Sequence, residues 1–198
     1  MTTGLTRGEQ SRARLLEAAT REFARLGYHQ TKISTIVADA GVTQPTFYLY
    51  FSGKEAIFDE LVTAFRQRMR TIVQHDPLAP DMTLPEVATR VQQLIEQGYQ
   101  LLGENPELTR IALIQAPDAE EIRREYAQLI SNNMQIHQAM RFFRSDVPPE
   151  IVAESILALI ERLALRFVLT GQQDAATLAR YTRDLILNGT LIERIELP

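Results

Sequence analysis

The sequence predicts an all-α fold with about nine helices. Apolar residues recur every three or four positions over most of the 198 residues, which is the period of a helix with one buried face. Capping signals precede several of these segments, and no segment alternates apolar and polar residues over more than a few positions, as a strand would. Hydrophobic residues make up 45% of the chain and charged residues 23%, the usual composition of a folded globular protein.

Four helices are predicted in the first part of the chain, over residues 6–27, 33–40, 44–50 and 52–75. Thr6 and Glu9 form a T-x-x-E capping box at the start of the first helix. Gly27 ends that helix because glycine accepts the left-handed conformation at a helix C-terminus, and Gly41 ends the second helix in the same way. Thr43 caps the third helix.

A loop and five further helices are predicted in the remainder of the chain. The loop lies at 75–82, where two prolines and two aspartates occur within eight residues. The helices are expected over 84–102, 105–115, 118–143, 149–170 and 174–195. We therefore expect two helical domains, over residues 1–52 and 76–198, linked by a helix over 52–75.

Charge is distributed unevenly along the chain. The net charge of the whole chain is −4, but residues 1–55 carry seven basic and five acidic residues, a net of +2, and the remainder has a net of −6. Both lysines of the chain, Lys32 and Lys54, fall in the basic part. A small basic head on an acidic body favours a polyanion bound at one end only.

The sequence argues against several classes of chemistry. There is no cysteine, which excludes disulfides, thiol nucleophiles and cysteine-ligated metals. The three histidines, His29, His75 and His137, lie in different predicted elements, and no glycine-rich phosphate loop or nucleophile motif occurs. We therefore expect no catalytic residue, no metal and no cofactor, with a helical hydrolase or dehydratase as an alternative.

Membrane insertion and export are also not expected. The longest purely apolar run, residues 156–160, is far shorter than the roughly 20 residues that a membrane-spanning helix needs. The first fourteen residues are polar and contain no apolar signal-peptide core. We expect a cytoplasmic protein.

Residues 33–51, ISTIVADAGVTQPTFYLYF, have the spacing of a helix-turn-helix. Gly41 permits a sharp turn between two short helices, and Phe47 and Phe51 are spaced to face the core together with Val42. The second helix of such a motif enters the DNA major groove. The alternative is a helix-turn-helix that serves only as packing.

The candidate DNA contacts lie on and around this second helix. Gln44 is of a type that bonds adenine bidentately, and Thr46 offers a methyl group and a hydroxyl to a base. Tyrosine hydroxyls reach phosphate oxygens, and a lysine near the start of a helix favours an anion there. The predicted contacts are Lys32, Ser34, Thr43, Gln44, Pro45, Thr46, Tyr48, Tyr50 and Lys54.

Residues from about 7 to 72 resemble the DNA-binding head of TetR-family regulators. The match runs from Gly27–Tyr28 through Thr31, Ile36, Ala40–Gly41–Val42, Tyr48, Phe51 and Lys54–Glu55 to Phe58, and it covers about a third of the chain. The chain departs from the family at Tyr50, where histidine is frequent, and at Ser34, where a basic or longer polar residue is frequent. The resemblance implies about nine helices and a homodimer. It also implies that residues 1–52 form the helix-turn-helix DNA-binding domain and that residues 76–198 form a ligand-binding and dimerisation domain that alters DNA affinity.

The last two predicted helices are apolar on more than one face. A helix on the surface of a monomer shows one apolar stripe, so the second face needs a cover. Pairing of both helices with their copies would bury that face in a two-fold dimer. The alternative is a central helix buried within one chain. The predicted interface residues are Ile156, Leu159, Ile160, Leu163, Phe167, Leu178, Tyr181, Leu185 and Ile192.

The ligand site is predicted within residues 84–143. A ligand pocket is mostly apolar with a few polar groups, and methionine is an adaptable lining residue. The predicted ligand-binding residues are Tyr99, Gln115, Asn133, Met134 and His137. The alternative for each polar residue is a solvent-facing or locally satisfied group.

These observations predict a dimeric, ligand-responsive repressor that binds a pseudo-palindromic double-stranded DNA operator and is released by a small, apolar effector. The GYHQ and FYLYF stretches resemble regulators that respond to fatty acyl-CoA. The competing interpretation is a helical small-ligand carrier or adaptor whose helix-turn-helix does not bind DNA.

Overall fold

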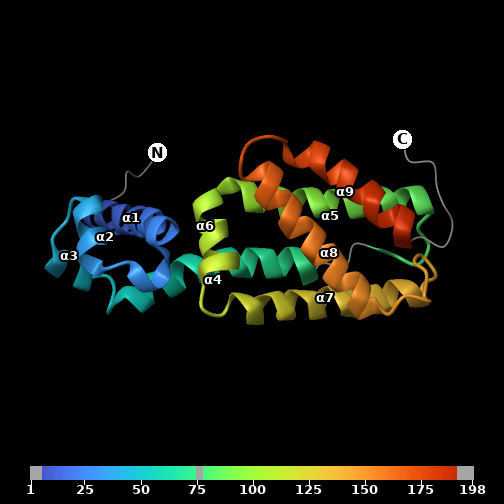
Figure 1. Cartoon of the computed structure of the whole chain (residues 1–198), viewed down its shortest axis with the longest axis horizontal. Coiled ribbons are helices and arrows are strands. Elements are labelled where there is room, and N and C mark those ends of the chain that lie inside the picture. The colour runs from blue at the N-terminus through green and yellow to red at the C-terminus, as the bar shows by residue number, and fades with distance from the viewer. Residues whose placement is uncertain (1–5, 75–77, 191–198) are drawn as a thin grey trace. The chain divides into compact units, whose positions relative to one another are not determined.

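The computed structural model describes residues 6–74 and 78–190, and within them the fold is all-α, as predicted (Figure 1). The elements are α1 (Arg7–Gln30), α2 (Ile33–Ala40), α3 (Gln44–Tyr48), α4 (Lys54–Gln74), α5 (Leu84–Glu104), α6 (Pro106–Arg110), the π-helical turn η1 (Ile111–Gln115), α7 (Ala119–Ala139), α8 (Pro149–Leu163), the π-helical turn η2 (Ala164–Val168) and α9 (Ala175–Thr190). They form two compact units, residues 1–67 with 107–119 and residues 68–106 with 120–198.

The first unit buries phenylalanine rings from α1, from α4, and from α3 with the segment that follows it. The Phe23 ring meets Phe58 edge to face with centroids 5.1 Å apart, and Phe47 lies 5.6 Å from Phe51. Phe23 and Phe47 are fully buried, as are Leu15 of α1 and Ile36 of α2. Edge-to-face aromatic contacts add about 0.5–1.5 kcal/mol each beyond the area that they bury, so the Phe23–Phe58 contact helps to hold α4 against α1.

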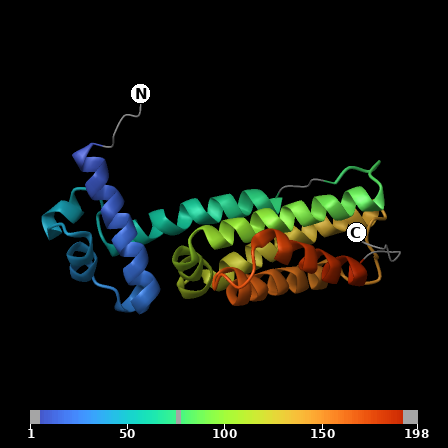
Figure 2. The same ribbon diagram turned by 90° about the horizontal axis from the view of Figure 1, so that it is seen from above.

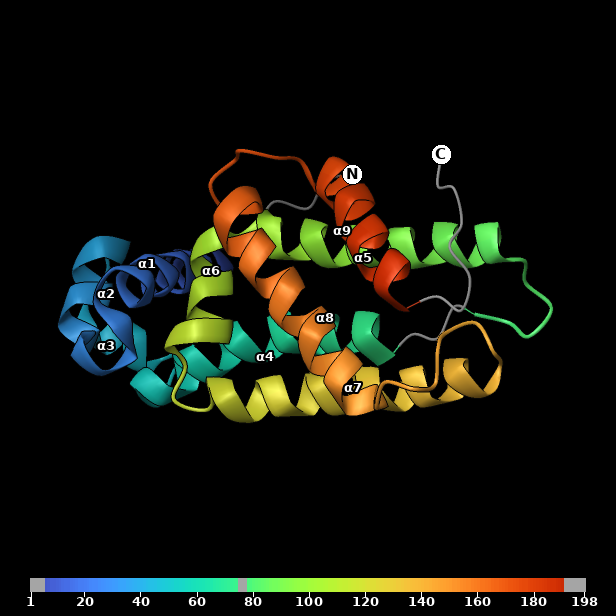
Figure 3. The same cartoon turned by 45° about the vertical axis from the view of Figure 1, so that its right-hand side comes forward.

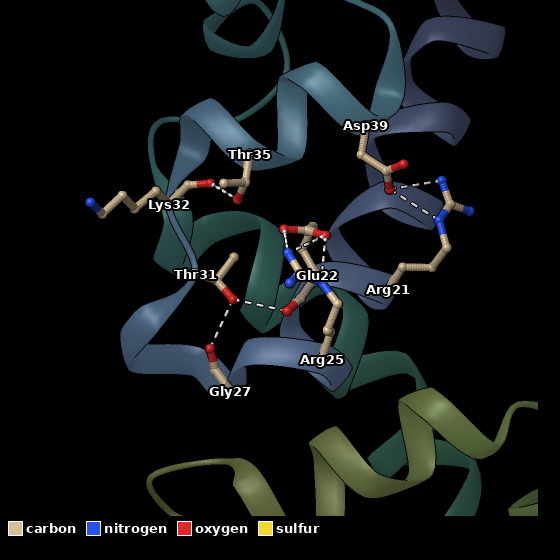
Figure 4. Close-up of polar contacts among 8 residues, drawn as sticks. All are labelled: Arg21, Glu22, Arg25, Gly27, Thr31, Lys32, Thr35 and Asp39. Carbon is tan, nitrogen blue, oxygen red and sulfur yellow. Dashed lines mark hydrogen bonds and ion pairs between the residues drawn. The ribbon is translucent and has the colours of Figure 1, made fainter.

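Gly27 bends α1 rather than ending it. Its φ of 77° interrupts the helix, which continues to Gln30, and Thr31 forms the C-cap. The Thr31 N–H donates to the Gly27 carbonyl at 3.2 Å. The Thr31 hydroxyl lies 2.8 Å from the same carbonyl and 3.1 Å from that of Glu22 (Figure 4). Thr31 therefore closes the end of α1 and leaves Lys32 as the N-cap of α2.

A segment from the middle of the chain also belongs to the first unit. The Gln115 carboxamide of η1 donates to the Ala24 carbonyl of α1 at 3.2 Å. Arg66 of α4 donates to both carboxylate oxygens of Asp118 at 2.7 Å and to the Ala112 carbonyl at 3.1 Å. These guanidinium bonds hold the pKa of Asp118 below its usual value. The boundary between the compact units therefore differs from the one expected at residue 76.

The second unit is a bundle of α5, α7, α8, α9 and the end of α4. Figure 1 shows α9 lying along α5, and Figure 2 shows α8 and α9 side by side. In Figure 3, α8 runs obliquely across α7, to which Arg123 and Glu161 join it at 2.9 Å. Arg68 pairs with Glu104 of α5, and Arg70 with Glu125 of α7.

Gly103 is required by the approach of η2 to α5. A Cβ atom at this position would lie 2.8 Å from the Val168 side chain, which is closer than carbon atoms pack. The two π-helical turns, each with one extra residue in its hydrogen-bonded ring, were not expected from the sequence, which predicted plain helix at both places.

Within the part of the chain that the structure describes, no helix combines the length and the apolar character needed to cross a lipid bilayer.

Candidate nucleic-acid interface

The turn between α2 and α3 is built by Gly41. Its φ of 63° and ψ of 37° are left-handed, the conformation that glycine adopts without a steric penalty. The next N–H, of Val42, donates to the Val37 carbonyl at 3.1 Å and closes the end of α2. The chain then reverses into α3.

The start of α3 is set by Thr43 and Pro45. The Thr43 hydroxyl accepts from the Thr46 N–H at 3.4 Å and lies 2.9 Å from the Thr46 hydroxyl. Pro45 stands in the first turn, where its missing N–H costs nothing. The burial of Phe47 and Phe51 confirms that these rings face the core, and it turns the opposite side of α3 outward.

The side chains predicted to contact DNA are mostly open to solvent. Tyr48 is 53% exposed. Lys32, Ser34, Thr43, Gln44 and Pro45 are exposed, and Thr46, Tyr50 and Lys54 are half-buried. The structure therefore brings the nine residues to the surface of one compact unit, while their contact with DNA stays a prediction.

Lys32 is a cation without a carboxylate partner among the described residues. Its side chain makes no capping bond, although it stands at the N-cap of α2. Figure 4 shows this side chain extending away from the two ion pairs beside it, Arg21–Asp39 and Arg25–Glu22. An exposed ammonium beside an uncapped helix start is suited to a phosphate.

Lys54 has a different environment from the one expected. Its ammonium nitrogen donates to the carbonyls of Tyr28 at 2.7 Å, Thr31 at 3.1 Å and His29 at 3.3 Å. It also lies 4.6 Å from the centroid of the Tyr28 ring. A lysine has three N–H donors, and here all three are occupied by the end of α1. The structure thus shows Lys54 holding that end of α1, and its predicted phosphate contact stays a prediction.

The depression at the start of α4 gives no further support for a phosphate there. It has a volume of about 430 Å³ and is lined by Ser52, Gly53, Lys54, Glu55, Ala56 and Asp59. The two carboxylates among these residues oppose a bound anion.

Most of the arginines in the first unit are already paired. Arg12 donates to Glu60 at 2.6 Å, and the pairs of Arg21 and Arg25 are described above. Arg7 and Arg14 have no carboxylate partner among the described residues, and Arg14 donates to the Ser11 hydroxyl at 3.3 Å. Arg7 lies beside Gly8, where a Cβ atom would be 3.4 Å from the Tyr50 hydroxyl. Arg7 is not among the contacts predicted from the sequence, because nothing in the local pattern indicates that the start of α1 lies near Tyr50.

The residues predicted to bind a ligand do not all come together. Gln115 lies in the first unit against α1, and its buried Oε1 has no hydrogen-bond partner among the described residues. The other four lie in the second unit, where Met134 and His137 are buried. The Asn133 carboxamide donates to the Val73 carbonyl at 3.0 Å.

Tyr99 is fully buried between α5 and α9. Its hydroxyl lies 2.8 Å from that of Thr182, which itself donates to the Leu178 carbonyl at 2.8 Å. Burial raises the pKa of Tyr99 to about 12, so at neutral pH the phenol is protonated and donates to Thr182. The structure therefore gives Tyr99 a partner within its own unit.

The apolar residues predicted at the dimer interface divide into two groups. Tyr181 and Leu185 of α9 are 47% and 63% exposed. Ile156, Leu159, Ile160, Leu163 and Phe167 are half-buried, which leaves part of each side chain uncovered. Leu178 is only 4% exposed and faces its own chain, so it is removed from the predicted interface. Ile192 lies outside the described residues.

Comparisons with known proteins agree on one family. The pattern of the bacterial regulatory proteins of the tetR family matches residues 15–61. The chain is 39% identical over 186 residues to YdgC of Bacillus subtilis (strain 168), an uncharacterised HTH-type transcriptional regulator, and the match covers 94% of this chain and 95% of YdgC.

Two crystal structures show the same fold. A TetR-like transcriptional regulator from Rhodococcus sp. RHA1 matches with a TM-score of 0.72 and 20% identity, over 94% of this chain and 98% of that one. The transcriptional regulator FadR from Bacillus subtilis, in complex with stearoyl-CoA, matches with a TM-score of 0.62 and 23% identity, over 90% of this chain and 98% of FadR.

The two lysines of the chain are expected to differ in their effect on DNA binding. Lys54→Met removes three bonds to carbonyls, so we expect the free energy of unfolding to fall by about 1–2 kcal/mol. The slope of log affinity against log salt should stay unchanged, because no phosphate contact is lost.

Lys32→Ala should leave the free energy of unfolding unchanged and flatten the slope of log affinity against log salt by about one unit. Urea unfolding and binding to duplex DNA at several salt concentrations measure both quantities. A flattened slope of log affinity against log salt for Lys54→Met would instead support a contact between Lys54 and a phosphate.

Proposed function

Because this chain belongs to the TetR family of helix-turn-helix transcriptional regulators, we propose that it is a repressor that binds a pseudo-palindromic operator as a homodimer and is released by a small, apolar effector. The observation that carries the proposal is the outward face of α3, on which Gln44 and Tyr48 stand clear of their own chain. A helix of this kind reads bases in the major groove.

Base reading is assigned to α3 and phosphate contact to the residues around it. The Gln44 carboxamide offers a donor and an acceptor to an adenine edge, and Thr46 offers its methyl group to a base. Lys32 and Tyr48 are exposed groups that suit phosphate oxygens. Arg7 joins them as a cation without a carboxylate partner among the described residues. Lys54 has a supporting role, since its donors are used within the chain.

The homodimer is supported by the uncovered apolar side chains of α8 and α9. On α9, Thr182 and Ile186 lie on the covered stripe, whereas Tyr181 and Leu185 lie on an exposed one. On α8, Ile151 is 54% exposed. A second copy would cover these side chains and would present a second α3 to the next half-site, roughly 34–36 Å along the DNA.

We propose fatty acyl-CoA as the effector class. The support is the likeness to FadR, whose crystal structure holds stearoyl-CoA, together with the resemblance of the GYHQ and FYLYF stretches. Release requires the effector to bind the form that does not bind DNA more tightly than the DNA-binding form. The helix α4 has residues in both compact units, and we assign the transmission of this preference to it.

Gln44→Ala is expected to relax sequence choice. Removal of the carboxamide abolishes the bidentate contact, so the preference for the operator over a substituted operator should fall by about 1–3 kcal/mol at one position of each half-site. Selection of bound DNA from a random pool, followed by binding to single-base variants, measures this preference. Gln74→Ala, an exposed glutamine at the end of α4, is the control. Equal loss on operator and random DNA for Gln44→Ala would contradict base reading.

A charge at Leu163 is expected to separate the protomers. Leu163→Glu places a carboxylate among the uncovered apolar side chains of α8, where burial of an unpaired charge is costly. Analytical ultracentrifugation should show monomers for this variant and dimers for the parent chain. Ile136→Glu, on an exposed isoleucine of α7, should remain dimeric. A dimer that persists in Leu163→Glu would place the interface elsewhere.

Stearoyl-CoA is expected to lower operator affinity by a few tens-fold, which corresponds to about 2 kcal/mol of coupling. Fluorescence anisotropy of labelled operator, titrated with stearoyl-CoA below its micelle concentration, measures this change. Coenzyme A alone and stearate alone are the controls. Saturable binding of stearoyl-CoA with no change in operator affinity would exclude it as the releasing effector.

A further inference from the structure

Leu49 is the most exposed large apolar side chain in the described part of the molecule, at 78%. It directly follows α3, and its N–H still donates to the Thr46 carbonyl at 3.3 Å, so the helical turn extends to it. An isolated surface leucine needs no explanation. This one stands beside Tyr48, itself 53% exposed, on the segment proposed to enter the major groove.

The helical spacing places Leu49 on the outermost side of α3. Residues four apart share a helix face, so Leu49 lies one turn beyond Pro45. Phe47, midway between them in sequence, points the opposite way and is fully buried. Pro45 and Leu49 therefore form an apolar ridge along the side of α3 that faces away from the core.

The charge of the residues around this ridge indicates which kind of partner fits it. The fourteen residues from Ala40 to Gly53 contain no charged side chain, so this surface carries neither an ion-pairing group nor a carboxylate that would repel DNA. Lys32, an exposed cation without a carboxylate partner among the described residues, stands at the N-cap of α2 in the same compact unit. The major groove offers one apolar feature, the C5-methyl group of thymine. An exposed apolar ridge on a segment that carries no charge is complementary to that feature.

We propose that Leu49 packs against a thymine methyl group in each half-site and is a specificity-determining residue of the operator contact. The inference rests on the proposed DNA-binding function and adds to it an apolar contact beside the amide contact of Gln44. It requires a thymine within reach of the end of α3 in each half-site.

The test replaces thymine by uracil, which removes only the methyl group. An operator is first selected from a random pool with the full-length chain, and each thymine is then replaced singly by deoxyuridine. At one position of each half-site, the loss of affinity should be about fourfold, the value for about 0.8 kcal/mol per buried methyl group. With Leu49→Ala, affinity for the thymine operator should fall, and the difference between thymine and uracil should disappear.

Two controls separate this contact from other causes. Leu49→Ala should keep the thermal midpoint of the parent chain, because the side chain is exposed. Ile114→Ala, which shortens an exposed isoleucine of η1 in the same compact unit, should keep the full uracil effect.

The outcomes distinguish this inference from the proposed function. Absence of sequence-selective binding by the parent chain would overturn both. If binding is sequence-selective but the replacement of thymine by uracil lowers the affinity of the parent chain and of Leu49→Ala by the same factor, only the thymine contact would be overturned. That contact would also be overturned if Leu49→Ala weakened thymine and uracil operators equally while a uracil effect remained. Binding by Leu49→Ala that matches the parent chain on both operators would overturn it as well and would leave the ridge to a protein partner.

Discussion

A helix of five residues is far too short to be stable in water, so everything that α3 presents outward depends on what it buries inward. Phe47 and Phe51 supply that anchor, because both rings are buried and lie 5.6 Å apart between their centroids. Thr43 and Gly41 determine where the short helix begins and from which direction the chain enters it. The outward side chains of α3 are exposed and add little to the packing of the unit, so the proposed base contacts can vary with little effect on stability.

Several basic side chains of the first unit are engaged in contacts within their own chain. Arg12, Arg21 and Arg25 are held by carboxylates, and Lys54 by the carbonyls at the end of α1. A count of basic residues therefore overstates the positive charge available to a phosphate backbone. In the proposed function, Lys32 and the other cations of the N-terminal segment that have no carboxylate partner among the described residues would supply affinity. The uncharged side chains on α3 would supply selectivity.

The second unit combines a buried hydrogen-bonded pair of hydroxyl groups with apolar side chains that are partly uncovered. Tyr99, Thr182 and the Leu178 carbonyl form a chain of hydrogen bonds in which each buried polar group has a partner. Unpaired buried groups cost more than made bonds contribute, so this chain fixes the register of α5 against α9. The exposed stripe of α9 and the open face of α8 are left for another surface.

The amino-acid sequence by itself determined the all-α fold, the helix-turn-helix and the inward direction of Phe47 and Phe51, because helix period, caps and turn glycines act between residues close in the chain. Only the tertiary structure decided that Lys54 binds the end of α1, that Gln115 packs against Ala24, and that Leu178 is covered by its own chain. Each of these outcomes depends on an element distant in sequence. A long side chain can reach several partners, and a helix that is apolar on two faces can bury either one, so local pattern alone leaves such choices open.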